Sequence, residues 1–116
     1  MFVVQRTPPF QAQLDALQRK HPSLERDVDW LRGRLEQAPD AIGDHARQIR
    51  AALPVFKTRC KDSCCNLSAR EGWRVYYAID KAARKVWLLF LIHKKEAENP
   101  GKDFLKQKIE RAFGGA

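Results

Sequence analysis

The chain has 116 residues, which is enough for one compact domain and too few for two. Its hydrophobic content of 44% argues against a disordered chain, and its net charge of +8 favours a polyanionic partner. No apolar run approaches the roughly 20 residues that span a bilayer, and the first residues lack the pattern of a signal peptide, so we expect a soluble, cytoplasmic protein.

The positive charge is concentrated in the second half of the chain. Residues 1–54 carry eight Lys and Arg against seven Asp and Glu, whereas residues 55–116 carry fourteen against seven. The excess is therefore +1 in the first half and +7 in the second. This distribution favours nucleic acid or an acidic protein as the partner, although a solubilising surface would carry the same charge.

The first half predicts a strand followed by a helical hairpin. Residues Phe2–Gln5 are β-prone, and Pro8-Pro9 ends that run because proline cannot donate to a sheet. Two runs at helical spacing follow, separated by His21-Pro22, and Ser23 can cap the second helix. Residues 40–54 fit either a short helix or an irregular connection. The apolar helix positions are Phe10, Leu14 and Leu17, then Leu24, Val28, Leu31 and Leu35.

Three strand-like runs follow, and the first has the sharpest pattern in the sequence. Val55–Lys61 alternates, with Phe56, Thr58 and Cys60 on one face and Lys57, Arg59 and Lys61 on the other. Trp73–Ile79 also alternates, and its second face carries Arg74 and Tyr76. Val86–Ile92 is apolar on both faces, which is typical of a central strand. Asn99-Pro100 then predicts the start of a C-terminal helix.

The sequence lacks the motifs of several common reaction centres. It contains no GxSxG, no Walker-type glycine loop and no HExxH, and its three histidines are scattered. Cys60, Cys64 and Cys65 are odd in number, and adjacent cysteines cannot easily both face one ion. We therefore expect no metal and no cofactor.

A group of Lys and Arg on a sheet face can hold a phosphodiester, and it could also cleave RNA without a metal. Cleavage needs a base for the 2′-hydroxyl, cations for the phosphorane charge and an acid for the 5′-oxygen. Crowded cations lower one another's pKa, so a lysine can exchange protons near neutral pH. Structural roles remain open as well. Lys57, Arg59 and Lys61 could protect an exposed edge strand from aggregation, and Arg74 could form an ion pair with Asp80 or Glu71. Tyr76 and His93 could be structural residues, and Lys94 and Lys95 could cap the end of an apolar strand.

The order of these elements and three short motifs resemble the RelE/ParE toxin superfamily, in particular its RelE/HigB-like mRNA interferases. The motifs are Phe56-Lys57-Thr58-Arg59, Gly72-Trp73-Arg74-Val75-Tyr76-Tyr77 and Leu88–Glu96. We accordingly expect a single α+β domain over residues 1–116. It would have a twisted, mainly antiparallel sheet, the N-terminal helical hairpin on one face, the basic site on the other, and a C-terminal helix.

The resemblance also implies a function. Members of this family are type II toxins that cleave mRNA on the ribosome and are silenced by a cognate antitoxin. The partners would be mRNA, the ribosome and that antitoxin, with no metal and no membrane. Two other functions stay open: a non-catalytic ParE-like toxin that acts on gyrase, and an inactive RNA-binding relic.

By position, the candidate catalytic residues are Lys57, Arg59, Arg74 and Lys95. The candidate substrate-binding residues are Lys61, Tyr76, His93 and Lys94. The catalytic tyrosine that some members carry near the last helix has no match, because Phe104, the nearest aromatic, lacks a hydroxyl. Tyr76 or His93 could substitute as the base that takes the 2′-hydroxyl proton.

Overall fold

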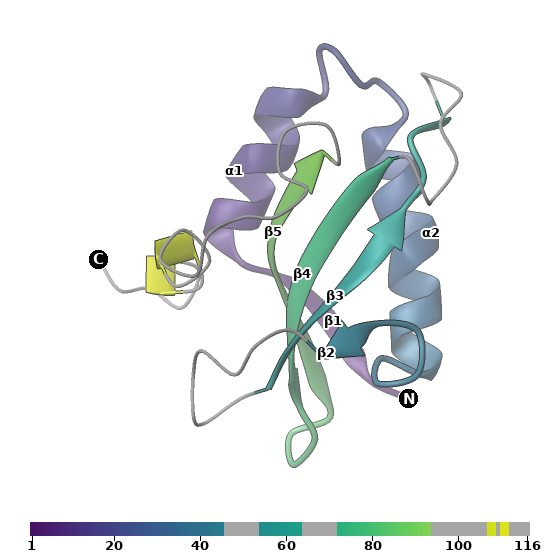
Figure 1. The fold of residues 1–116 in the computed structure, drawn as a ribbon, viewed down its shortest axis with the longest axis vertical. Helices are drawn as coiled ribbons and strands as arrows, with labels where there is room; N and C mark the ends of the chain where they lie inside the picture. The colour runs from purple at the N-terminus through teal and green to yellow at the C-terminus, as the bar shows by residue number, and fades with distance from the viewer. Residues whose placement is uncertain (46–53, 64–71, 94–106, 109, 112–116) are drawn as a thin grey trace.

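Figure 1 shows the fold in a computed structural model, which describes residues 1–45, 54–63, 72–93, 107, 108, 110 and 111. The described strands form one sheet in the order β1-β5-β4-β3-β2. β1 runs parallel to β5, and the other three pairs are antiparallel, which confirms a mainly antiparallel sheet. The strands are β1 (Val3–Arg6), β2 (Asp44–His45), β3 (Val55–Cys60), β4 (Trp73–Asp80) and β5 (Lys85–His93).

The short strand β2 was not predicted. It pairs with the start of β3 within a segment for which the sequence allows a short helix or an irregular connection. Residues 46–53 of that segment lie outside the described residues. The predicted C-terminal helix falls mostly outside them too, although Gln107, Lys108, Glu110 and Arg111 are helical. Among the described helices, none has the length and apolar character needed to cross a membrane.

Two helices, α1 (Pro8–Leu17) and α2 (Leu24–Gln37), cover one face of the sheet, as predicted (Figure 1). Their apolar stripes are buried against it, and each fully buried aliphatic side chain contributes about 1.5–3 kcal/mol. The core that they form contains Phe10 and Leu14 from α1, Leu24, Val28, Leu31 and Leu35 from α2, and Cys60, Trp73, Val75, Tyr77, Ile79, Val86, Leu88 and Leu91 from the sheet.

The start of α2 differs from the prediction. Ser23 occupies the capping position but makes no side-chain cap. Its hydroxyl donates instead to the carboxylate of Asp27, at 2.9 Å. A buried carboxylate is a stronger acceptor for a hydroxyl than a backbone group is, so the helix start takes part in a buried polar network rather than in an ordinary cap.

Strand β5 lies between β1 and β4, and both of its faces are buried, which confirms a central strand. Its register with β4 shifts once, because Tyr76 pairs with Phe90 whereas Tyr77 pairs with Leu88. Leu89 is the extra residue of this bulge. The bulge reverses the alternation of β5 at that point, so Leu88 and Leu91 both belong to the core under the helices.

Candidate functional site

The pairing of β3 with β4 brings four of the predicted site residues together. Arg59 lies directly opposite Arg74, and Lys57 lies directly opposite Tyr76. Residues two apart on a strand share a face, so the four side chains form a two-by-two group. Their neighbours Cys60, Trp73, Val75 and Tyr77 belong to the core under the helices, so the group occupies the other face. We call Lys57, Arg59, Arg74 and Tyr76 the β3–β4 cluster.

Like charges face each other in the β3–β4 cluster. Directly opposed residues hold their Cβ atoms about 4.5–5.5 Å apart, and like charges in this position are destabilising. Lys57 and Arg59 are exposed, and within the described part of the chain neither has an ion-pair partner. The guanidinium of Arg74 is half-buried and donates to the Trp73 carbonyl at 3.2 Å. An anion bound between the two arginines would relieve their repulsion.

Tyr76 is the buried member of the β3–β4 cluster. Its ring stacks on Phe90 with centroids 4.5 Å apart and an interplanar angle of 11°, and the residue is only 4% exposed. Desolvation raises the pKa of Tyr76, and the nearby positive charge of Arg74 opposes that shift without cancelling it. The phenol therefore stays protonated at neutral pH. It suits the role of a hydrogen-bond donor to an anion, and it is poorly suited to accept a proton from a 2′-hydroxyl.

An ion pair between Arg74 and Asp80 does not fit the strand geometry. Both residues lie on β4, six positions apart, which corresponds to roughly 20 Å along an extended strand. The carboxylate of Asp80 instead accepts a hydrogen bond from the Ala83 amide at 3.0 Å, in the turn that follows. Glu71, the other suggested partner, lies outside the described residues.

The other predicted site residues do not join the β3–β4 cluster. Lys61 follows the last residue of β3, and its ammonium lies 4.7 Å from the ring centroid of Trp30 on α2. His93 pairs with Trp73 and faces the helices, on the opposite side of the sheet from Arg74. Lys94 and Lys95 lie outside the described residues.

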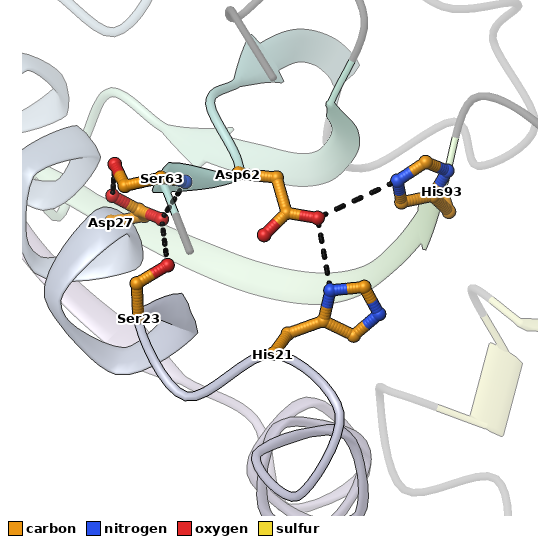
Figure 2. Close-up of polar contacts among 6 residues, drawn as sticks. All are labelled: His21, Ser23, Asp27, Asp62, Ser63 and His93. Carbon is orange, nitrogen blue, oxygen red and sulfur yellow. Dashed lines mark hydrogen bonds and ion pairs between the residues drawn. The ribbon is translucent and has the colours of Figure 1, made fainter. Parts of the chain in front are cut away.

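His93 belongs to a buried polar network around Asp62 (Figure 2). The Asp62 carboxylate is fully buried and lies 2.9 Å from Nδ1 of His21 and 3.6 Å from Nε2 of His93. Both imidazoles contact the indole of Trp73, with centroid distances of 4.8 and 4.9 Å, and their own centroids lie 5.9 Å apart. This network joins the connection between the helices to the ends of β3 and β5, and it places His93 on the helix side of the sheet.

A second buried carboxylate lies beside this network, at Asp27 of α2 (Figure 2). It accepts hydrogen bonds from the Ser23 hydroxyl at 2.9 Å, the Ser63 amide at 2.9 Å and the Ser63 hydroxyl at 2.6 Å. Asp27 is 1% exposed, so these three donors replace its water shell. Together Asp27 and Asp62 hold the chain in place just after β3.

The Cys60 thiol is buried under α2 and donates to the backbone carbonyl of Asp27, with a sulfur–oxygen distance of 3.5 Å. Burial, aided by the negative charge of Asp27, raises the pKa of Cys60 to about 12. Cys60 is therefore a packing residue and a poor metal ligand. No group of three potential metal ligands occurs among the residues that the structure describes. Cys64 and Cys65 lie outside them.

We expect the buried thiol of Cys60 to make the protein less stable at alkaline pH. In the folded protein the thiol stays neutral, whereas in the unfolded chain it ionises above its ordinary pKa of 9.0. The contribution of this raised pKa to the free energy of unfolding is therefore fully present below pH 9.0 and is lost as the pH rises toward about 12. Between pH 9 and 10.5 the free energy of unfolding should therefore fall by about 2 kcal/mol more in the wild type than in Cys60→Ala. Urea denaturation at both pH values measures this difference. Parallel losses in the two proteins would contradict it.

No protein-family model matches this sequence, and no curated protein matches it. A solved structure does share its fold: a chain of the toxin–antitoxin complex RelBE2 from Mycobacterium tuberculosis superposes with a TM-score of 0.58 at 24% identity. The match covers 79% of this chain and 90% of that chain. The fold is therefore RelE-like, as the sequence motifs imply.

Proposed function

We propose that this chain is the toxin of a type II toxin–antitoxin system and that it acts as a metal-independent, ribosome-dependent endoribonuclease. The proposal depends above all on one observation, the direct opposition of Arg59 and Arg74 across β3 and β4. Two adjacent guanidinium groups suit the oxygens of a phosphodiester, which they can bind in pairs. The RelE-like fold supports the proposal, because the similar chain belongs to a toxin–antitoxin complex.

In the proposed reaction the 2′-hydroxyl attacks the adjacent phosphorus and the bond to the 5′-oxygen breaks. The products are a 2′,3′-cyclic phosphate and a 5′-hydroxyl. Arg59 and Arg74 bind the non-bridging oxygens and stabilise the charge of the phosphorane. Tyr76, which remains a phenol, donates a hydrogen bond to the same phosphate.

Two proton transfers complete the proposed reaction. Lys57, opposite Tyr76, is our candidate for the group that, as a neutral amine, accepts the proton of the 2′-hydroxyl. Lys95 is our candidate for the acid that protonates the 5′-oxygen, and Lys94 would bind the substrate beside it. Because Lys61 and His93 lie on other sides of the molecule, we leave both out of the site.

Inducible expression in a bacterial host, with mapping of mRNA 5′ ends, tests this function. We expect growth arrest with cuts at a fixed position within codons. Both should be lost in Arg59→Ala and kept in Lys81→Ala, which removes a surface cation far from the cluster, in the turn after β4. Arrest with DNA damage and intact mRNA would indicate a gyrase-directed toxin instead. A folded protein that causes no arrest would leave only an RNA-binding role.

A further inference from the structure

The outer side of α2 carries an exposed aromatic residue that the proposed reaction does not use. Trp30 is 42% exposed and is the only aromatic among the large exposed hydrophobic residues that the structure describes. The buried stripe of α2 faces the sheet, so Trp30 projects away from the core. An exposed tryptophan is unfavourable in a free protein and is frequent at the centre of protein interfaces.

Among the described residues, two cations lie against the Trp30 ring. The guanidinium of Arg34, one turn along α2, lies 5.3 Å from the ring centroid, and the ammonium of Lys61 lies 4.7 Å from it. Neither cation has a carboxylate partner among the described residues. By contrast, Arg32 on the same helix is neutralised by Asp29 at 2.8 Å and Glu36 at 3.1 Å.

This arrangement is preorganised for an anionic group. Contact with the ring already restricts the long side chains of Arg34 and Lys61, so less conformational entropy is lost when they bind. A carboxylate that meets either cation would gain a charge-assisted hydrogen bond. The exposed part of the indole would at the same time contact an apolar side chain of the same partner.

The charge of α2 favours a protein over a nucleic acid as the occupant. The helix carries four acidic residues against three basic ones, a net charge of −1 within a protein of net charge +8. A continuous phosphate backbone laid along this helix would meet the accessible carboxylates of Glu25, Asp29 and Glu36 at close range, whereas the carboxylate of Asp27 is buried. The acidic residues are Glu25, Asp27, Asp29 and Glu36, and the basic ones are Arg26, Arg32 and Arg34.

We propose that Trp30, Arg34 and Lys61 form a docking surface for an acidic segment of a partner protein. Carboxylates of that segment pair with Arg34 and Lys61, and an adjacent apolar side chain covers the exposed part of the indole. This Trp30 surface lies on the helix side of the sheet, whereas the β3–β4 cluster lies on the other face. A partner bound to the Trp30 surface therefore leaves the β3–β4 cluster unoccupied. The inference does not depend on the proposed function.

A random library of 16-residue peptides displayed on phage, selected against the folded full-length chain, tests the Trp30 surface. We expect enriched peptides to combine clustered Asp or Glu with an aromatic or aliphatic residue. The Kd of a synthetic copy should rise at least tenfold with Trp30→Ala and with Arg34→Glu. It should change less than twofold with Arg19→Glu, a matched charge reversal at an exposed position beyond the end of α1.

Four results of the peptide experiment would overturn the inference: selection of no peptide, selection of peptides without acidic residues, equal weakening by Arg19→Glu, or unchanged affinity in Trp30→Ala. A dimer that Trp30→Ala converts to a monomer would also overturn it, because a second copy would then be the occupant. The same holds if Trp30→Ala weakens the binding of a 30-residue RNA tenfold. Thermal melting confirms that each variant is folded, so that none of these results reflects unfolding.

Discussion

Replacing Arg74 with alanine is expected to slow RNA cleavage by a factor of about 100 to 1,000, which corresponds to about 2.7–4 kcal/mol of lost transition-state stabilisation. The guanidinium of Arg74 is held by the Trp73 carbonyl, so it is positioned before the substrate arrives. Such a preorganised donor gains most when charge develops on the phosphorane. Single-turnover cleavage of mRNA bound to ribosomes measures the effect.

The same substitution should leave the fold intact. Arg74 is half-buried, and its charge faces that of Arg59, so its removal relieves a repulsion of about 0.2–1 kcal/mol. The substitution also removes the hydrogen bond to the Trp73 carbonyl, so we expect a melting temperature close to that of the wild type. Loss of activity together with a lower melting temperature would point to misfolding and would contradict a role at the phosphate.

Arg74→Lys is the matched control, because lysine keeps the charge and loses the planar pair of donors. Its cleavage rate should lie between those of the wild type and Arg74→Ala. Lys81→Ala removes an exposed cation in the turn after β4 and should cleave at the wild-type rate. Cleavage by Arg74→Ala at the wild-type rate would show that the β3–β4 cluster does not take part in the reaction.

The faces of β3 and β4 could be predicted because alternation is a local property of a strand. Lys57 and Arg59 had to share a face, as did Arg74 and Tyr76, wherever the two strands lay. Whether the two pairs meet depends on the pairing register of β3 with β4. The apolar and polar faces of the strands limit the possible registers but do not select one of them. The prediction that Lys61 shares a strand face with Lys57 and Arg59 was wrong, because β3 ends at Cys60 and the ammonium of Lys61 lies against the ring of Trp30.

The face of His93 could not be predicted from local pattern. β5 is apolar on both faces, so its sequence carries no sign of the bulge at Leu89 that reverses the alternation. The contacts of His93 with Asp62, and of Asp62 with His21, join residues far apart in the chain. Asp27 did carry a local signal, because it lies within the apolar stripe of α2, where a carboxylate must find partners.

Replacing Asp27 with alanine is expected to lower the free energy of unfolding by about 2–4 kcal/mol. The substitution removes an acceptor from three donors, and each hydrogen bond to a charged group contributes about 1.5–3 kcal/mol before the desolvation of the carboxylate is set against it. The Ser63 amide would be left without its partner in a partly buried position. Urea denaturation at pH 7 measures the loss, which is large against the 5–15 kcal/mol typical of a domain.

Asp29→Ala, two residues along the same helix, is the matched control. Asp29 is exposed, and its ion pair with Arg32 is a surface pair that contributes at most about 1 kcal/mol. Equal losses in the two variants would contradict a stabilising role for the buried network. Asp27→Asn keeps one acceptor oxygen and should fall between them.

The Asp27 and Arg74 results are informative together because the two substitutions should affect different quantities, stability in one case and cleavage in the other. Asp27 lies on the helix side and ties Ser63 to α2, so its loss should reduce stability while every residue of the β3–β4 cluster remains present. Arg74 lies on the other face, so its loss should slow cleavage by a factor of about 100 to 1,000 with little change in stability. If Asp27→Asn, measured well below its melting temperature, loses as much cleavage as Arg74→Ala, the two faces are coupled through the end of β3, and the geometry of Arg59 depends on the anchor at Ser63.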